Sequence, residues 1–251
     1  MSDRDVLVVA SPAELGQART RRSFLRALGV GGTIVLLPSV FAACGDDDDD
    51  ATGIGGGVAL DLSTDTGILN YAYALEQLEA AFYTQVVTAA NFTTLITSAA
   101  ERELFTDLRN HEVIHREFLK AAIPTGRIGD LAVDFTGALA SRATIFQAAV
   151  AFEDLGVSAY NGAGRGFTDT DTGRALLTIA GKIVSVEARH ASAVRDASVN
   201  ATTAFADLAS LTGLGADVAS ARDVVRNPTQ VLTAADPYIT TSVSLSKGLR
   251  R

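Results

Sequence analysis

The sequence predicts an all-α fold, a four-helix bundle followed by a C-terminal extension of helices and loops. Four long segments repeat apolar residues every three to four positions, which is the period of an amphipathic helix. Each segment has a start or stop signal at one of its ends, and no stretch between them alternates like a strand. The 251 residues, 47% hydrophobic and 20% charged, suit one globular domain with appendages.

The first helix is expected from about Thr66 to Ala89, with Asp65 as its N-cap. Its inward stripe is spaced three and four apart and consists of Leu69, Ala72, Glu76, Glu79, Tyr83 and Val86. Two carboxylates on an apolar stripe are costly to bury unless another group pairs with them. The stripe therefore points to a partner for these acids inside the protein.

The second helix is expected from about Ser98 to Ala122, where Pro124 stops it. One of its faces carries Leu104, Leu108, Glu112, His115 and Leu119. The third helix is expected from about residue 139 to residue 161, with Ile145, Ala149, Phe152, Glu153, Val157 and Tyr160 inward. Gly162, Gly164 and Gly166 follow it and are read as a helix stop and turn. The second and third helices thus also bring acids to an apolar face.

The fourth helix is expected to follow Asp171 as N-cap and to end near Ala197. Its inward residues are expected to be Leu177, Ala180, Val184, Glu187, His190 and Val194. Residues 60–200 are therefore predicted to form the bundle. Residues 201–251, with turns at Asn227-Pro228 and Asp236-Pro237, are predicted to form an extension that packs on it.

The N-terminus is typical of an export signal. Arg21 and Arg22 form a twin arginine, and an uncharged run follows as far as Cys44. Small residues precede this cysteine, the only one in the chain, as in the lipobox of bacterial lipoproteins. Residues 1–43 are therefore predicted to be a twin-arginine lipoprotein signal and Cys44 a lipid-modified membrane anchor. An uncleaved membrane anchor is the alternative, and both interpretations place the domain outside the cytoplasm.

Residues 44–59 are predicted to form an acidic, glycine-rich tether, because five aspartates at 46–50 precede a run of glycines. Removal of residues 1–43 leaves 16 basic and 26 acidic residues, a formal charge of −10. Nucleic acid is excluded as an expected partner, since phosphate binding needs a basic face.

Glutamate, tyrosine and histidine recur in the same order in both halves of the bundle. Glu76 with Tyr83 precedes Glu112-x-x-His115, and Glu153 with Tyr160 precedes Glu187-x-x-His190. The glutamates lie 36 residues apart in the first half and 34 in the second. A Glu and a His three positions apart on a helix can reach the same ion. Four carboxylates and two imidazoles facing inward can hold two divalent metals, whose charge offsets the cost of burial.

These motifs resemble the ferritin-like superfamily of di-iron and di-manganese carboxylate proteins. The sequence is most similar to an exported ferritin-like family related to plant desiccation-related proteins. The resemblance covers about residues 60–240. It is carried by the segments LNYAYALE at 69–76, LEAAFY at 78–83, HEVIH at 111–115, LGVSAY at 155–160 and VEARHA at 186–191.

The resemblance implies a centre of two Fe or two Mn ions. Glu112 and Glu187 would bridge the metals, Glu76 and Glu153 would be terminal ligands, and His115 and His190 would each bind one ion. Tyr83 would lie close to the centre, in the position of a catalytic tyrosine of bacterioferritin-like proteins, although Tyr83 and Tyr160 can equally be packing residues. The role of Glu79 stays open between a ligand, an outer contact and a residue on the path of ions.

The implied activity is a reaction with O₂ or H₂O₂, as a ferroxidase or in the manner of a manganese catalase, in oxidative or desiccation stress. The alternative is a structural or stress-protective surface protein without turnover. A homo-oligomeric storage cage is a third interpretation, which a lipid anchor complicates. A zinc protease reading of HEVIH, with His111 and His115 as ligands, leaves the second Glu-x-x-His motif unexplained. His111 is instead expected at the surface or behind the ligands.

Overall fold

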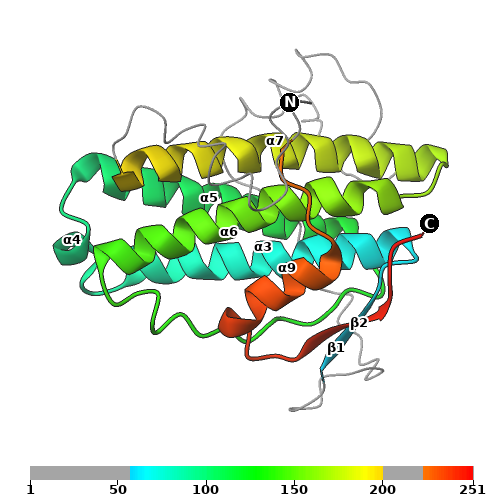
Figure 1. Ribbon diagram of the computed structural model, residues 1–251, viewed down its shortest axis with the longest axis horizontal. Coiled ribbons are helices and arrows are strands. Elements are labelled where there is room, and N and C mark those ends of the chain that lie inside the picture. The colour runs from blue at the N-terminus through cyan, green and yellow to red at the C-terminus, as the bar shows by residue number, and fades with distance from the viewer. Residues whose placement is uncertain (1–56, 200–222, 251) are drawn as a thin grey trace, which may run out of the picture.

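Four long helices lie side by side in the computed structural model, which describes residues 57–199 and 223–250 (Figure 1). They are α3 (Asp65–Thr88), α5 (Ala99–Ala122), α6 (Arg142–Ala163) and α7 (Asp171–Val199). Helix α3 packs along α5, α6 packs along α7, and α3 also contacts α6. A single turn, α4 (Phe92–Leu95), lies between α3 and α5. The predicted all-α bundle is confirmed.

The N-caps of α3 and α7 lie one residue earlier than predicted. The Thr64 hydroxyl accepts from the backbone N–H of Gly67 at 2.9 Å, and the Thr170 hydroxyl accepts from that of Gly173 at 3.1 Å. Threonine and aspartate both cap helices well, so local sequence cannot choose between neighbours. Asp65 and Asp171 instead occupy the first turn, where a negative charge favours the helix dipole.

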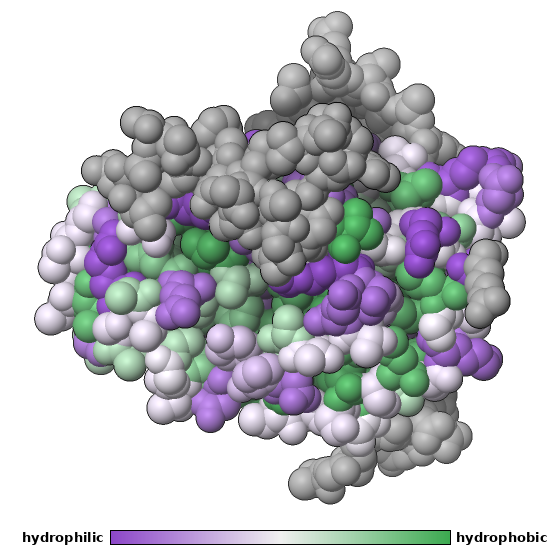
Figure 2. All heavy atoms as spheres, in the orientation of Figure 1, coloured by the Kyte–Doolittle hydropathy of each residue, from purple (hydrophilic) through white to green (hydrophobic). Residues whose placement is uncertain are grey.

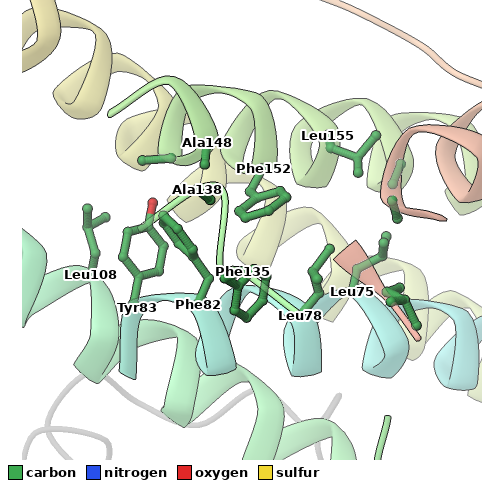
Figure 3. Close-up of a cluster of buried hydrophobic side chains, with 14 of the residues drawn as sticks. Leu75, Leu78, Phe82, Tyr83, Leu108, Phe135, Ala138, Ala148, Phe152 and Leu155 are labelled. Atoms are coloured by element: carbon green, nitrogen blue, oxygen red, sulfur yellow. The ribbon is translucent and has the colours of Figure 1, made fainter. Parts of the chain in front are cut away.

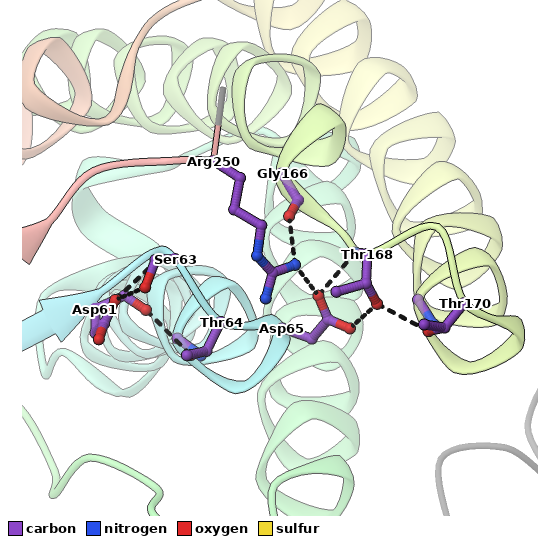
Figure 4. Close-up of polar contacts among 10 residues, drawn as sticks. Asp61, Ser63, Thr64, Asp65, Gly166, Thr168, Thr170 and Arg250 are labelled. Atoms are coloured by element: carbon purple, nitrogen blue, oxygen red, sulfur yellow. Dashed lines mark hydrogen bonds and ion pairs between the residues drawn. The ribbon is translucent and has the colours of Figure 1, made fainter.

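The Asp65 carboxylate makes tertiary contacts in place of the predicted cap (Figure 4). It accepts from the backbone N–H of Thr168 at 2.9 Å and from the Arg250 guanidinium at 3.1 Å. Arg250 also donates to the carbonyl of Gly166, at 3.3 Å. Asp65 therefore joins the start of α3 to the link between α6 and α7 and to the C-terminal segment.

Helix α6 begins three residues later than expected, at Arg142. Ser141 and Thr144 form a reciprocal capping box, in which the side chain of each accepts from the backbone N–H of the other. The helix ends at Ala163 and is followed by one 3₁₀ turn, η2 (Gly164–Gly166). The predicted stop at the glycines is confirmed.

Residues 123–141 connect α5 to α6 by crossing over the length of the bundle (Figure 1). Two buried amides on α3 hold this crossover. Asn70 donates to the carbonyl of Gly126 at 2.8 Å and accepts from the N–H of Ile128 at 2.9 Å. Gln77 accepts from the N–H of Leu131 at 2.8 Å. The amides satisfy backbone groups that no helix or sheet would otherwise pair.

The described C-terminal residues pack on the bundle through helix α9 (Pro228–Ala235), which contacts α6. A 3₁₀ turn, η4 (Asp236–Tyr238), follows it. At Gly162 a side chain would place its Cβ 1.9 Å from the carbonyl oxygen of Arg226, so the close approach of this segment requires glycine.

A two-stranded parallel sheet, β1 (Val58–Asp61) with β2 (Val243–Lys247), was not predicted. Each strand is too short to show alternation, and the two are far apart in sequence. Lys247 donates to Asp61 at 2.9 Å beside the sheet.

The core is built around edge-to-face aromatic contacts (Figure 3). The ring of Phe82 lies 5.0 Å from that of Phe152 and 5.4 Å from that of Phe135, which comes from the crossover. The expectation that Leu177 faces inward is wrong, because it is 45% exposed. Helix α7 buries Leu176 and Ile183 instead. Each of them lies one residue before a position that was predicted to face inward.

The predicted twin arginine, Cys44 and the aspartates at 46–50 lie outside the described residues, as do residues 201–222 of the predicted extension. Within residues 57–199 and 223–250, no helix combines the length and apolarity needed to cross a membrane. On the face shown in Figure 2, hydrophilic and hydrophobic residues of the described part are mixed, as on an ordinary protein surface.

Candidate metal centre

Five glutamates and two histidines are buried where the four long helices face one another. Helices α3 and α6 contribute only glutamates, whereas α5 and α7 each contribute a glutamate and a histidine. Each of these residues is at most 9% exposed, and they are Glu76, Glu79, Glu112, His115, Glu153, Glu187 and His190. They are carried inward because they sit on the apolar stripes that the bundle buries.

Six of these residues form two groups of possible ligands. Glu76, Glu112, His115 and Glu187 form the first group, and Glu112, Glu153, Glu187 and His190 form the second. In each group the donor atoms all lie within 4.8 Å of one another. The two groups share Glu112 and Glu187, the pair for which a bridging role was predicted. All six predicted ligands are therefore brought together.

The histidine nitrogens converge on the carboxylates. His115 Nδ1 lies 2.9 Å from Glu187 Oε1 and 3.3 Å from Glu112 Oε2. His190 Nδ1 lies 2.7 Å from Glu112 Oε1 and 3.5 Å from Glu153 Oε2. Neither nitrogen forms a hydrogen bond despite these distances. The atoms point toward a common space between them, as metal ligands do.

The cluster fits a pair of metal ions because its polar atoms lack other partners. Both carboxylate oxygens of Glu112 and of Glu187 are buried without a hydrogen bond, and so is Nδ1 of both histidines. Buried charges without partners are costly, and a divalent cation removes that cost. Carboxylate and imidazole ligands suit Fe and Mn. The Glu/His cluster is thus compatible with a di-metal centre, without fixing the metal's identity.

Burial also perturbs the carboxyl groups electrostatically. It raises the pKa of Glu76 to about 7 and raises the pKa of Glu153 above its ordinary value. Burial, together with the negative charge of neighbouring glutamates, raises the pKa values of Glu79 and Glu187 well above theirs. These acids bind protons more readily than free glutamates do, so a metal ion must compete with protons for them.

The pKa values of Glu112 and of the two histidines are shifted in the direction that favours their charged forms. Burial alone would lower the pKa of His190, but contact with Glu112 and Glu153 raises it to about 10. The pKa of His115 is raised in the same way by Glu112, Glu187 and Glu76. Burial would raise the pKa of Glu112, yet the two histidines lower it to about 2. Glu112 is therefore the central anion of the cluster.

Two buried tyrosines bond to the glutamates across the bundle. Tyr83 on α3 donates to Glu153 Oε1 on α6 at 2.5 Å, and Tyr160 on α6 donates to Glu76 Oε1 on α3 at 2.6 Å. Each hydroxyl fixes the orientation of one carboxylate. Periodicity placed the tyrosines on the inward faces, but it could not reveal that each serves the opposite helix.

His111 lies behind the cluster and not in it. Its Nδ1 is 2.8 Å from Nε2 of His190, whose Nδ1 faces the carboxylates. His111 is exposed and belongs to neither ligand group. The zinc-protease interpretation of HEVIH needs His111 beside His115 on one ion, and the geometry does not support it.

An apolar cavity of about 20 Å³ lies between the helices beside Tyr160. Residues of α3, α5, α6 and α7 line it, among them Leu69, Ala72, Ala159, Tyr160, Leu176 and Ala180. Tyr160 connects the cavity to the cluster through its bond to Glu76. About 10–15 Å³ holds one water, so the cavity has room for a molecule of a few atoms, and its apolar walls favour an apolar one.

A four-helix bundle with a buried Glu/His cluster of this kind defines the class of carboxylate metal proteins. The family model described as a ferritin-like domain matches residues 64–200 of the chain. The chain therefore belongs to the ferritin-like domain family. No curated protein matched the sequence in a direct comparison. The narrower similarity to desiccation-related proteins stays a prediction.

Proposed function

We propose that the protein binds two Fe or two Mn ions in the cluster and reacts with O₂ or H₂O₂, as a ferroxidase or a catalase-like enzyme. The observation that carries this proposal is that the two ligand groups share Glu112 and Glu187. Two ions held by common carboxylates lie close enough to act on one small molecule.

The ligand roles follow from membership of the groups. Glu76 and His115 occur only in the first group and would hold one ion, while Glu153 and His190 occur only in the second and would hold the other. If bound together, two such metals would supply electrons to the O–O bond. If Fe²⁺ is oxidised and released, it is a substrate rather than a resident cofactor.

The chain's own residues prepare the site for this chemistry. Tyr83 and Tyr160 hold Glu153 and Glu76 in place, and the surrounding core excludes water. The contact of His111 with His190 Nε2 fixes the ring so that Nδ1 faces the ligands. Because Tyr83 is buried against a ligand carboxylate, it is also placed to exchange a proton or electron with the centre.

The cavity beside Tyr160 favours O₂ as the oxidant. O₂ is apolar and loses little on leaving water, whereas H₂O₂ would give up hydrogen bonds that the apolar walls do not replace. The protein is therefore expected to consume O₂ with Fe²⁺ more readily than it dismutates H₂O₂.

Export and membrane attachment belong to the same proposal. Arg21-Arg22 and Cys44 support export by the twin-arginine route and lipid anchoring. This route carries folded proteins, so the centre could be loaded before export. A tethered protein that removes O₂, H₂O₂ or Fe²⁺ outside the cytoplasm would serve in oxidative or desiccation stress.

The test compares consumption of O₂ and of H₂O₂ by metal-loaded wild-type protein, Glu112→Gln and Glu112→Ala. Glu103→Ala is the matched control, because Glu103 is an exposed glutamate on the same helix. The proposal requires turnover by wild type and Glu103→Ala and its loss in both Glu112 variants. Equal inertness of all four proteins when loaded with metal would instead favour a structural, stress-protective role without turnover.

A further inference from the structure

The two halves of the site differ at one position. In α3 the ligand Glu76 is followed three residues later by Glu79 and seven residues later by Tyr83. In α6 the ligand Glu153 is followed at the same offsets by Gly156 and Tyr160. A glutamate in one half thus corresponds to a glycine in the other.

These two positions meet in space. A Cβ on Gly156 would lie 2.9 Å from Glu79 Oε1 and 3.2 Å from Glu187 Oε2. The Glu79 carboxylate therefore occupies the space that a side chain at position 156 would fill, next to a shared ligand of the cluster. Glycine at 156 is needed to seat this carboxylate.

One carboxylate oxygen of Glu79 is buried without a hydrogen-bond partner. The residue is 2% exposed, and its Oε2 makes no hydrogen bond. Its neighbour at this point is another carboxylate, because Glu187 Oε2 and Glu79 Oε1 both lie within 3.2 Å of the position that a Cβ on Gly156 would take. A fifth carboxylate among four others is stable as an anion only if additional positive charge reaches it.

The position of Glu79 on helix α3 indicates which of the two metal ions it would bind. Glu79 stands one helical turn from Glu76, the same spacing by which Glu112 and His115 reach one ion. Glu76 belongs only to the first ligand group, with His115. Glu79 lies outside the set of atoms within 4.8 Å of one another, so its side chain would have to rotate to reach the ion, and a side chain at position 156 would stand in the way.

We propose that Glu79 is an additional carboxylate ligand of the ion held by Glu76 and His115, and that it makes the two metal positions unequal. Glu79 acts in this way only at the dinuclear centre proposed above. The Glu76/His115 position carries the greater negative charge, so it binds a divalent ion more tightly than the Glu153/His190 position does.

The test uses two titrations of the metal-free protein. Mn²⁺ binding is measured by calorimetry, and Co²⁺ binding is measured by the visible absorption of the bound ion. Wild type is expected to bind in two steps of unequal affinity. Glu79→Gln keeps the shape of the side chain and should weaken the tighter step by about tenfold or more while leaving the other nearly unchanged. The Co²⁺ absorption of the tighter step should change as a ligand is lost, which a purely structural role would not cause.

Gly156→Ala provides an independent variant, because its methyl group would displace the Glu79 carboxylate from the opposite helix. It should weaken the same step most, because the methyl group would meet Glu79 at 2.9 Å and the shared ligand Glu187 only at 3.2 Å. Glu103→Gln, on the exposed face of α5, is the control and should match wild type. Circular dichroism and melting of each metal-free variant establish that it folds.

The outcomes separate this inference from the proposed function. Two Mn²⁺ bound by folded Glu79→Gln with wild-type affinities and an unchanged Co²⁺ spectrum would overturn the role of Glu79 alone. Wild-type protein that binds neither metal would overturn the dinuclear centre itself.

Discussion

Tyr83 on helix α3 donates a 2.5 Å hydrogen bond to Glu153 on helix α6, and Tyr160 on α6 returns an equivalent bond of 2.6 Å to Glu76 on α3. Each half of the repeat thereby orients a cluster carboxylate of the other half. The duplicated halves are interdependent, since neither contains the donor that fixes its own glutamate.

Tyr83→Phe should destabilise the protein. The change leaves Glu153 Oε1 buried without its donor, and an unsatisfied buried acceptor costs about 1–3 kcal/mol. Tyr160→Phe should cost a similar amount through Glu76. Denaturant unfolding of the metal-free proteins measures both. If Tyr83 also acts in catalysis, Tyr83→Phe should lower O₂ turnover beyond any loss of metal. Losses below about 0.5 kcal/mol would show that the bonds contribute little.

The stability of the metal-free protein should fall as the pH rises. The folded-state pKa of Glu76 is raised to about 7 from 4.5, and that of His190 is raised to about 10 from 6.5. Both groups bind protons more tightly when folded, so their contribution is present at low pH and is lost as the pH rises between about 4.5 and 10. The lowered pKa of Glu112 acts in the opposite sense only below about 4.5.

Metal should reverse this trend. Ligation requires deprotonated carboxylates, so stabilisation by Mn²⁺ should increase as the pH rises from 6 toward 8. Melting temperatures with and without Mn²⁺ across this range measure the effect. A metal-free protein whose melting temperature rises steadily from pH 5 to 9 would show that the cluster is not protonated as described.

Filling the apolar cavity should slow the reaction with O₂. Ala159→Val places two further methyl groups in the cavity wall, whereas Ala148→Val makes the same change on α6 in the core cluster that does not line the cavity. Each is expected to cost about 1–3 kcal/mol in stability through overpacking. Only Ala159→Val should lower the rate of O₂ consumption, with the rate for H₂O₂ unchanged. Equal rates for the two variants would exclude the cavity as an O₂ site.

Much of this site could be predicted from the sequence, because the metal-binding pattern is local to each helix. The two Glu-x-x-His motifs and the single Glu76 and Glu153 are identified by spacing alone, and helical geometry then directs them inward. The cap assignments failed by one residue, since adjacent Thr and Asp compete and a tertiary contact takes Asp65. The strands β1 and β2 exist only through pairing across the chain.

The remaining features of the site depend on how the helices face one another. The crossed tyrosine bonds and the fit of Glu79 against Gly156 join residues 70 or more positions apart. The sequence shows Glu79 and Gly156 at equal offsets, and that signal becomes meaningful only when α3 and α6 are seen to pack together. Leu177 was misplaced for a related reason, because two adjacent apolar stripes on α7 compete for the core.

Membrane attachment should depend on the single cysteine. Cys44→Ser should move the exported protein from the membrane to the soluble extracytoplasmic fraction, because the chain contains no other cysteine that could be lipidated. Ser39→Ala, which leaves Cys44 in place, is the control. Fractionation followed by immunoblotting measures the distribution. Retention of Cys44→Ser in the membrane would indicate that residues 1–43 stay attached as an uncleaved anchor.

The central claim is that the buried Glu/His cluster holds two redox-active metals. The most direct test is metal content per chain by plasma mass spectrometry, on protein exported by its own signal and purified without chelators. We expect about two Fe or Mn ions per chain, and fewer than about one in Glu112→Ala. No bound metal, or about one zinc ion that survives the Glu187→Ala change, would contradict the dinuclear carboxylate centre.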